Sequence, residues 1–201
     1  MCPMKLFETI VHEKQYQERL LHWQFWLDKA DELVTAARLL EPEIKRYWEN
    51  AAAKQIGKSK KKKSGITRYP LLQDIHFMLI AYAIENYLKA AILRTDSDKL
   101  ANEIKVGKKS VPEQITTHDL YKLAKDVGLK PNADEEELLI RLYQSSTWRG
   151  RYPVPANREG LKSIQKTADG KPHFTAYLSL RDVSTINDLL IRVKQYVKKR
   201  S

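Results

Sequence analysis

Residues 71–94 read LLQDIHFMLIAYAIENYLKAAILR, and this stretch decides the fold. Apolar residues recur in it so densely that a helix of this sequence is apolar on nearly every face. Such a helix is typical of the centre of a bundle, because a helix at the rim keeps one polar face toward water. The interior polar residues are His76, Glu85, Asn86 and Lys89. Since a lone buried carboxylate is costly, we expect Glu85 to pair with Lys89, one turn later, or with an arginine.

The segments at the two ends of the chain predict helices that surround this stretch. Residues 13–53 predict a long helical arm whose apolar residues recur in steps of three and four: Trp23, Leu27, Ala30, Val34, Ala37, Leu40, Ile44, Trp48 and Ala51. Pro42 lacks an N–H and clashes with the preceding turn, so we expect a break there and two helical pieces that both follow the bundle. Residues 182–200 predict a C-terminal helix with one apolar face: Val183, Ile186, Leu190, Val193 and Val197.

Two shorter helices are predicted after the central stretch. The first has Thr116 as its N-cap, with Asp119 as the reciprocal partner, and ends at Gly128. The second begins with Asn132 or Asp134 as its cap and carries acidic residues in its first turn, where they complement the helix dipole. Both helices have an apolar face that can pack on the central helix.

The predicted architecture is an all-α, up-and-down helical bundle formed by a single domain, residues 1–201, with its core in residues 71–155. Residues 54–70 are charged, contain glycine and serine, and have few apolar residues, so they predict a long basic loop. Four consecutive lysines in this loop repel one another and resist folding: Lys60, Lys61, Lys62 and Lys63.

The charge balance favours a polyanionic partner. The chain has 36 lysine and arginine residues against 25 acidic residues, a formal net charge of +11. RNA, DNA or an acidic protein fits this balance, because neutralising phosphates releases bound counterions. The lysine cluster of the basic loop would give non-specific, salt-sensitive contacts to nucleic acid, or it is simply a solvated loop.

Other patterns narrow the class of protein. Cys2 is the only cysteine, which rules out an intrachain disulfide and a cysteine-based metal cluster, and favours a reducing, cytoplasmic setting. The most apolar run, residues 77–84, is too short to span a bilayer, and the first residues do not resemble a secretory signal. Metal-ligand spacings, a glycine-rich phosphate loop and a GxSxG elbow are missing from the sequence, so we expect no metal and no cofactor.

Three motifs, in order along the chain, resemble the HEPN family (higher eukaryotes and prokaryotes nucleotide-binding). The pattern A-x-E-x-x-L-K-A is matched by Ala83, Glu85, Leu88, Lys89 and Ala90, and H-D-L-x-x-L by His118, Asp119, Leu120 and Leu123. The ending W-x-G-R-Y-P, from Trp148 to Pro153, resembles one branch of uncharacterised bacterial HEPN-like proteins. Together these motifs cover residues 71–155.

The resemblance implies a helical bundle that is usually dimeric, and it suggests a homodimer formed through helix faces. Many HEPN proteins are metal-independent ribonucleases in toxin–antitoxin, defence or RNA-processing systems. Their signature is an arginine followed after four to six residues by a histidine. The five histidines of this chain lack an arginine at that spacing, so the signature is absent. Other members of the family bind nucleotides or dock nucleotidyltransferase-type partners.

The turn Trp148-Arg149-Gly150-Arg151-Tyr152-Pro153 has a functional and a structural interpretation. In the first, Arg149 and Arg151 bind phosphate through their guanidinium groups, while Trp148 or Tyr152 stacks on a base. In the second, the two aromatic residues are buried and the arginines pair with Glu85 or with the acidic residues 134–137. The sequence leaves both open.

His118 suggests a further possibility, in which it meets Glu85 and one arginine of the turn in a single site. The histidine would then act as acid or base, the arginine would bind phosphate and Glu85 would orient the histidine. Three functions follow. The first is an RNA- or nucleotide-binding protein without the usual nuclease motif. The second is a metal-independent ribonuclease that uses an atypical pair of His118 with Arg149 or Arg151. The third is a non-catalytic module that docks a nucleotidyltransferase-type partner.

Overall fold

The computed structural model describes residues 12, 15–16, 18–55, 72–105, 113–152, 154–156, 158, 164–166, 172–174 and 180–199. Its helices are α2 (Trp23–Arg38), α3 (Glu41–Gln55), α4 (Gln73–Lys105), α5 (Glu113–Thr116), α6 (Leu120–Asp126), α7 (Ala133–Gln144) and α8 (Leu180–Lys199). A π-helical turn, η1 (Ser145–Arg149), follows α7, and the three-residue strands β1 (Ile164–Lys166) and β2 (Pro172–Phe174) pair in antiparallel fashion. The predicted all-α helical bundle is confirmed.

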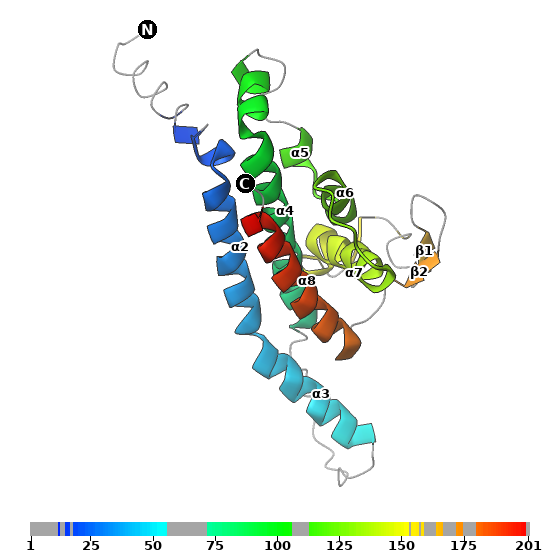
Figure 1. The fold of residues 1–201 in the computed structure, drawn as a ribbon. Coiled ribbons are helices and arrows are strands. Elements are labelled where there is room, and N and C mark those ends of the chain that lie inside the picture. The colour runs from blue at the N-terminus through cyan, green and yellow to red at the C-terminus, as the bar shows by residue number, and fades with distance from the viewer. Residues whose placement is uncertain are drawn as a thin grey trace.

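Helix α4 is the centre of the bundle (Figure 1). It packs against α2, α6, α7 and α8, and the side chains of Ile84, Leu88 and Leu93 are fully buried. Helix α4 continues beyond the apolar stretch 71–94 and ends at Lys105. The helix persists there because Leu100 is buried while its polar neighbours remain on the outer side.

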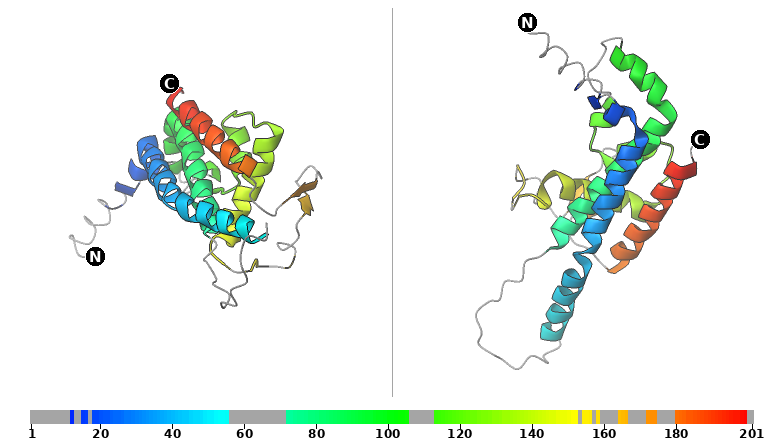
Figure 2. Two further views of the ribbon diagram at one scale, coloured as in Figure 1. Left: turned by 90° about the horizontal axis from the view of Figure 1, so that it is seen from below. Right: turned by 90° about the vertical axis from the view of Figure 1, so that its left-hand side faces the viewer.

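The N-terminal arm breaks where the sequence predicted a break. Helix α2 ends at Arg38 and α3 begins at Glu41, so Pro42 lies in the first turn of α3, where its missing N–H costs nothing. Helix α2 packs along α4, but α3 extends beyond the end of the bundle (Figures 1 and 2). The prediction that both pieces follow the bundle is therefore wrong for α3, in which Trp48 is 44% exposed.

The caps of α6 and α7 fix the loops between them. The N-cap of α6 is Asp119, whose side chain accepts a hydrogen bond from the backbone N–H of Lys122, so the prediction of Thr116 as the cap is wrong. Gly128 follows α6 with φ of 75°, a left-handed conformation that glycine adopts without strain. Asn132 caps α7 in a reciprocal capping box with Glu135. Of the two predicted caps, Asn132 and Asp134, the first is therefore confirmed.

Charged residues attach α8 to the other helices. Arg141 of α7 forms a bidentate pair with Asp182, and Lys194 of α8 pairs with Asp31 of α2. Burial opposes ionisation of Asp31, but hydrogen bonds from Lys194 and Tyr87 outweigh it and lower the pKa of Asp31. The apolar face of α8 is buried as predicted, except at its start, where Val183 is exposed.

Candidate functional site

A buried ion pair lies in the middle of α4. The side chains of Glu85 and Lys89 are 7% and 3% exposed, and Lys89 Nζ donates to Glu85 Oε1 at 2.6 Å. This is the pairing one turn apart that the sequence predicted. The ammonium group also lies 5.6 Å from the centre of the Trp26 ring, which contributes a cation–π attraction on the α2 side. Two charges are thus held inside the bundle at fixed positions.

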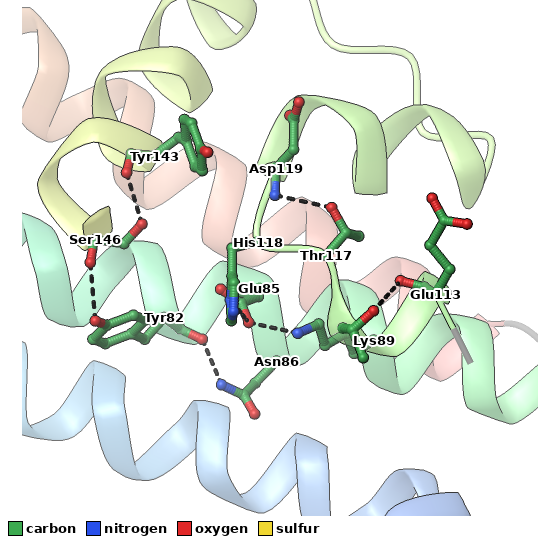
Figure 3. Close-up of polar contacts among 11 residues, drawn as sticks. Tyr82, Glu85, Asn86, Lys89, Glu113, Thr117, His118, Asp119, Tyr143 and Ser146 are labelled. Carbon is green, nitrogen blue, oxygen red and sulfur yellow. Dashed lines mark hydrogen bonds and ion pairs between the residues drawn. The ribbon is translucent and has the colours of Figure 1, made fainter. Parts of the chain in front are cut away.

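His118 lies over this pair, at the start of α6 (Figure 3). Its Nδ1 is 3.0 Å from Glu85 Oε1, and its side chain is 65% exposed. The backbone that carries it is held by the N-cap Asp119, whose own N–H donates to Thr117 Oγ1. A carboxylate can only accept, so neutral His118 carries its proton on Nδ1 and keeps a lone pair on Nε2. An imidazole oriented in this way can accept a proton from a ligand.

Glu85 retains one further site for a hydrogen bond. Its Oε1 contacts both Lys89 and His118, while Oε2 is buried without a hydrogen-bond partner among the described residues. A buried carboxylate oxygen without a donor is costly, so Glu85 favours any donor that approaches it. The exposed imidazole of His118 already contacts Oε1 at 3.0 Å, and its protonated form would strengthen this contact.

The π-helical turn η1 places the predicted arginine–aromatic turn against the first half of α4. The N–H of Gly150 donates to the carbonyl of Ser145, and Tyr82 of α4 donates to the carbonyl of Ser146 at 3.0 Å. A Cβ atom on Gly150 would lie 2.4 Å from Cβ of Met78. Glycine is therefore required here because the two backbones are in close contact.

Each arginine of the turn lies over an aromatic ring. The guanidinium of Arg149 is 5.2 Å from the centre of the Trp148 ring, and that of Arg151 is 5.7 Å from the Tyr152 ring. Arg151 is exposed and also donates to the carbonyl of Thr147. Trp148 and Arg149 are half-buried, whereas Tyr152 is 57% exposed. The aromatic residues therefore support the cations at the surface.

Asp74, in the first turn of α4, is the acidic group that acts on Arg149. Burial raises the pKa of Asp74, and the positive charge of Arg149 opposes this rise without cancelling it. The structural interpretation of the turn required the arginines to pair with Glu85 or with residues 134–137. The observed contacts differ from this interpretation: Glu85 is paired with Lys89 and His118, and the arginines lie over Trp148 and Tyr152.

The structure brings His118 and Glu85 together but places the arginines elsewhere. Asp74, on which the charge of Arg149 acts, precedes Glu85 by three turns of α4, about 16 Å along the axis at about 1.5 Å per residue. Asp74, Met78, Tyr82 and Glu85 recur in steps of three and four, so both clusters lie on one face of α4. Sequence reasoning missed Asp74 and Tyr82, although this spacing relative to Glu85 was a usable signal.

Three other sequence predictions concern the basic loop, metal binding and membrane-spanning segments. Lys60, Lys61, Lys62 and Lys63, with the rest of the basic loop after Gln55, lie outside the described residues, as does Pro153. In the described ranges, histidine, cysteine and carboxylate side chains form no group of three or more that could hold a metal ion. Among the described helices, none combines the length and the apolar character needed to cross a lipid bilayer.

Comparisons of the chain with protein-family models, with curated proteins and with solved structures found no match. The resemblance to HEPN proteins therefore rests on the motifs at residues 83–90, 118–123 and 148–153, and it stays a prediction.

Proposed function

We propose that this chain is a cytoplasmic, HEPN-like RNA-binding protein that holds its ligand on the arginine–aromatic face of η1. The observation that supports the proposal is the stacking of Arg149 on Trp148 and of Arg151 on Tyr152 at the surface of the bundle. The aromatic ring restricts the motion of each guanidinium, and the N–H groups remain available among the described residues, except the one that Arg151 donates to the carbonyl of Thr147. A planar, oriented guanidinium is suited to the bidentate binding of phosphate oxygens.

Single-stranded RNA fits this face better than a duplex. Tyr152 is 57% exposed beside Arg151, so it offers an aromatic surface on which an unpaired base can stack. The bases of a duplex are already stacked on one another and offer no free face. The net charge of +11 adds a long-range attraction for a polyanion, which falls as salt is raised.

A salt series with a fluorescent single-stranded RNA oligonucleotide tests the proposal. For the double variant Arg149→Ala/Arg151→Ala we expect Kd to rise by about tenfold or more, because two charged donors are lost. The slope of log K against log salt should fall by about 1.4, or about 0.7 for each phosphate contact on a single strand. Fluorescence anisotropy measures both quantities.

The matched control removes two arginine or lysine charges from α3 instead. Lys45 and Arg46 are exposed there, in pairs with Glu49 and Glu43. Lys45→Ala/Arg46→Ala should change Kd by less than about threefold, because it alters only the general charge of the protein. Equal losses in the two double variants, or no binding by the wild type at low salt, would refute the proposal.

A second candidate function, a metal-independent ribonuclease, is favoured by the contact between His118 and Glu85. In this reaction Nε2 of His118 takes the proton of a ribose 2′-hydroxyl, the 2′-oxygen attacks the neighbouring phosphorus, and the 5′-oxygen leaves with a proton from water. Glu85 is a positioning residue, since it holds Nδ1 of the imidazole at 3.0 Å. The predicted phosphate-binding residue Arg149 acts on Asp74, which precedes Glu85 by about three turns of α4, so the pair of His118 with an arginine needs an extended RNA that spans both.

Incubation of mixed RNA with the protein in EDTA tests this reaction. Wild-type protein should leave 2′,3′-cyclic phosphate ends, His118→Ala should abolish cleavage, and Glu85→Gln should shift the pH–rate profile. His22→Ala is the control, since His22 is exposed and its ring lies against Phe25, away from α6. Intact RNA with the wild-type protein, or equal cleavage by the His118 variant, would exclude the reaction but would leave the binding proposal standing.

A further inference from the structure

Tyr143, in the last turn of α7, is more open to water than Tyr82 of α4. Tyr82 is half-buried, and its hydroxyl donates to the carbonyl of Ser146 at 3.0 Å. Tyr143 is 38% exposed, and its hydroxyl has no hydrogen-bond partner among the described residues. A single exposed ring is ordinary on a protein surface, so its rigidity and its place decide whether it can bind a ligand.

The backbone that carries Tyr143 is held on both sides. Leu142 is fully buried and Gln144 is 8% exposed, so the residues before and after the tyrosine are fixed in the bundle while its ring remains outside. The hydroxyl of Ser146 donates to the carbonyl of Tyr143 at 2.8 Å, which connects the end of α7 to η1. A tyrosine on a rigid backbone offers a large contact surface at a small cost in conformational entropy.

Tyr143 also lies between the two clusters of the candidate site. Helix α7 continues directly into η1, which carries Arg149, and it packs against α6, whose first turn is preceded by His118. In Figure 3 the ring of Tyr143 lies between Ser146 of η1 and the loop of His118. A ligand that extends from Arg149 toward His118 therefore passes the ring.

The surface around Tyr143 suits a base better than a phosphate. The charged residue in the stretch 140–148 is Arg141, and its guanidinium is held by the bidentate pair with Asp182. A phosphate gains little at such a surface, whereas the face of a base can stack on an aromatic ring. In proteins that bind single strands, basic residues hold the backbone and aromatic residues stack the bases. The arginines of η1 and Tyr143 are suited to these two tasks.

We propose that Tyr143 is a base-stacking platform that extends the RNA site of η1 toward His118. The inference rests on the proposed function, because the arginines must first hold the strand. From Asp74 to Glu85 the two clusters are about 16 Å apart along α4, a length that a stacked strand covers in about five nucleotides at about 3.4 Å each. The site therefore takes a single strand of about five or more unpaired nucleotides.

Binding of a single strand of about ten nucleotides tests the platform, with 2′-O-methyl riboses so that the strand stays intact if His118 is catalytic. Tyr143→Leu should raise Kd by about fivefold or more, because leucine keeps apolar bulk but offers no ring on which a base can stack. Tyr143→Phe should bind within about twofold of the wild type, because it keeps the ring. Fluorescence anisotropy measures Kd, and thermal denaturation checks that the variants are equally folded.

An abasic strand of the same length separates stacking from phosphate contacts. It keeps the phosphates but has no bases, so Tyr143→Leu should bind it like the wild type, whereas Arg149→Ala/Arg151→Ala should bind it more weakly. Phe25→Leu is the matched control for the loss of an exposed ring, since Phe25 is 52% exposed on α2, on the other side of α4 from α7 (Figures 1 and 2). It should bind both strands like the wild type.

The outcomes separate this inference from the proposed function. If Tyr143→Leu binds the full strand like the wild type, or weakens binding of both strands equally, Tyr143 is not a stacking platform, and a loss in the arginine variant would still support RNA binding by η1. A loss in Tyr143→Phe as large as that in Tyr143→Leu would also overturn the inference, because the ring would then not account for the binding. If the wild type binds neither strand at low salt, the proposed function fails and the platform fails with it.

Discussion

Two polar clusters lie on the same face of α4 and differ in their exposure to water. Glu85 and Lys89 are buried at the centre of the bundle, whereas Asp74 and Arg149 are half-buried at its edge. In the central cluster the Coulomb attraction is strong but both ions have lost their hydration. At the edge the ions keep part of their hydration, so their attraction is weak and a ligand can replace it.

The difference separates structural from binding roles. A buried pair is held at one geometry, because moving either partner leaves an uncompensated charge inside the protein. Arg149 instead has two weak partners, the ring of Trp148 and the charge of Asp74, and can exchange them for a phosphate. His118 combines features of both clusters: its Nδ1 contacts the buried carboxylate of Glu85, but its side chain is 65% exposed.

The largest predicted effect is at the buried pair. Lys89→Met keeps the apolar stem but leaves the charge of Glu85 without its closest partner, so we expect a loss of about 3–5 kcal/mol in the free energy of unfolding. Chemical denaturation with urea measures this loss. The double variant Glu85→Leu/Lys89→Met should recover most of it, because neither charge is then buried.

An exposed pair provides the control for this prediction. Lys122 of α6 lies 3.3 Å from Glu113, and both side chains are at least half exposed. Lys122→Met should change the free energy of unfolding by less than about 1 kcal/mol. Equal losses at Lys89 and Lys122 would show that the pair at the centre of α4 is not buried as described.

A smaller effect is predicted where η1 meets α4. Gly150→Ala adds a Cβ atom 2.4 Å from Cβ of Met78, and also close to its Cγ and Sδ, so the two backbones must separate. We expect a loss of about 1–3 kcal/mol in the free energy of unfolding and weaker RNA binding, because the arginines on either side of Gly150 move with the backbone. Thermal denaturation and RNA binding together measure this effect.

The second variant at this contact distinguishes backbone from side-chain crowding. Met78→Ala in the Gly150→Ala background removes Cγ and Sδ but retains Cβ, the atom closest to the added methyl group. The double variant should therefore remain destabilised. Recovery of wild-type stability would mean that the flexible end of Met78, rather than the α4 backbone, sets the limit.

The sequence predicted those features that depend on neighbours along the chain. The pairing of Glu85 with Lys89, the break at Pro42 and the turn at Gly128 each follow from a spacing of a few residues. The central position of α4 followed from its apolar faces, because a helix of that composition has no polar side to turn toward water. These features do not depend on how distant segments meet.

The sequence did not predict features that depend on a change of helical period or on the point at which a helix leaves the bundle. In η1 the N–H of Gly150 reaches back five residues to Ser145, and a period of 3.6 gives no sign of this. The apolar stripe of the arm continues past Pro42 at the same spacing. Nothing local therefore shows that α3 leaves the bundle and exposes Trp48.

The smallest predicted effect is at Asp74 and Arg149, at the edge of the bundle. Asp74→Asn removes the carboxylate whose charge acts on Arg149, so RNA binding should become tighter, by less than about fivefold, the effect of a weak attraction between two partly hydrated charges. Asp188→Asn, at an exposed position on α8, removes the same charge elsewhere and is the control. Anisotropy titrations at low salt measure both. An equal gain in the two variants would mean that only net charge matters.

The pH dependence of binding sharpens the same prediction, because the pKa of Asp74 is raised by burial against the opposing charge of Arg149. Because the pKa of Asp74 is higher in the folded protein than its reference pKa of 3.8 in the unfolded chain, protonation of Asp74 stabilises the folded state. This stabilisation is complete at pH values below 3.8 and is lost as the pH rises through the pKa of the folded protein. As pH falls toward that pKa, Asp74 is neutralised and releases Arg149, so the wild type should bind RNA more tightly. Asp74→Asn should lack this part of the pH dependence, since its amide cannot ionise. If the variant and the wild type gain affinity equally on acidification, other groups carry the effect and Asp74 does not restrain Arg149.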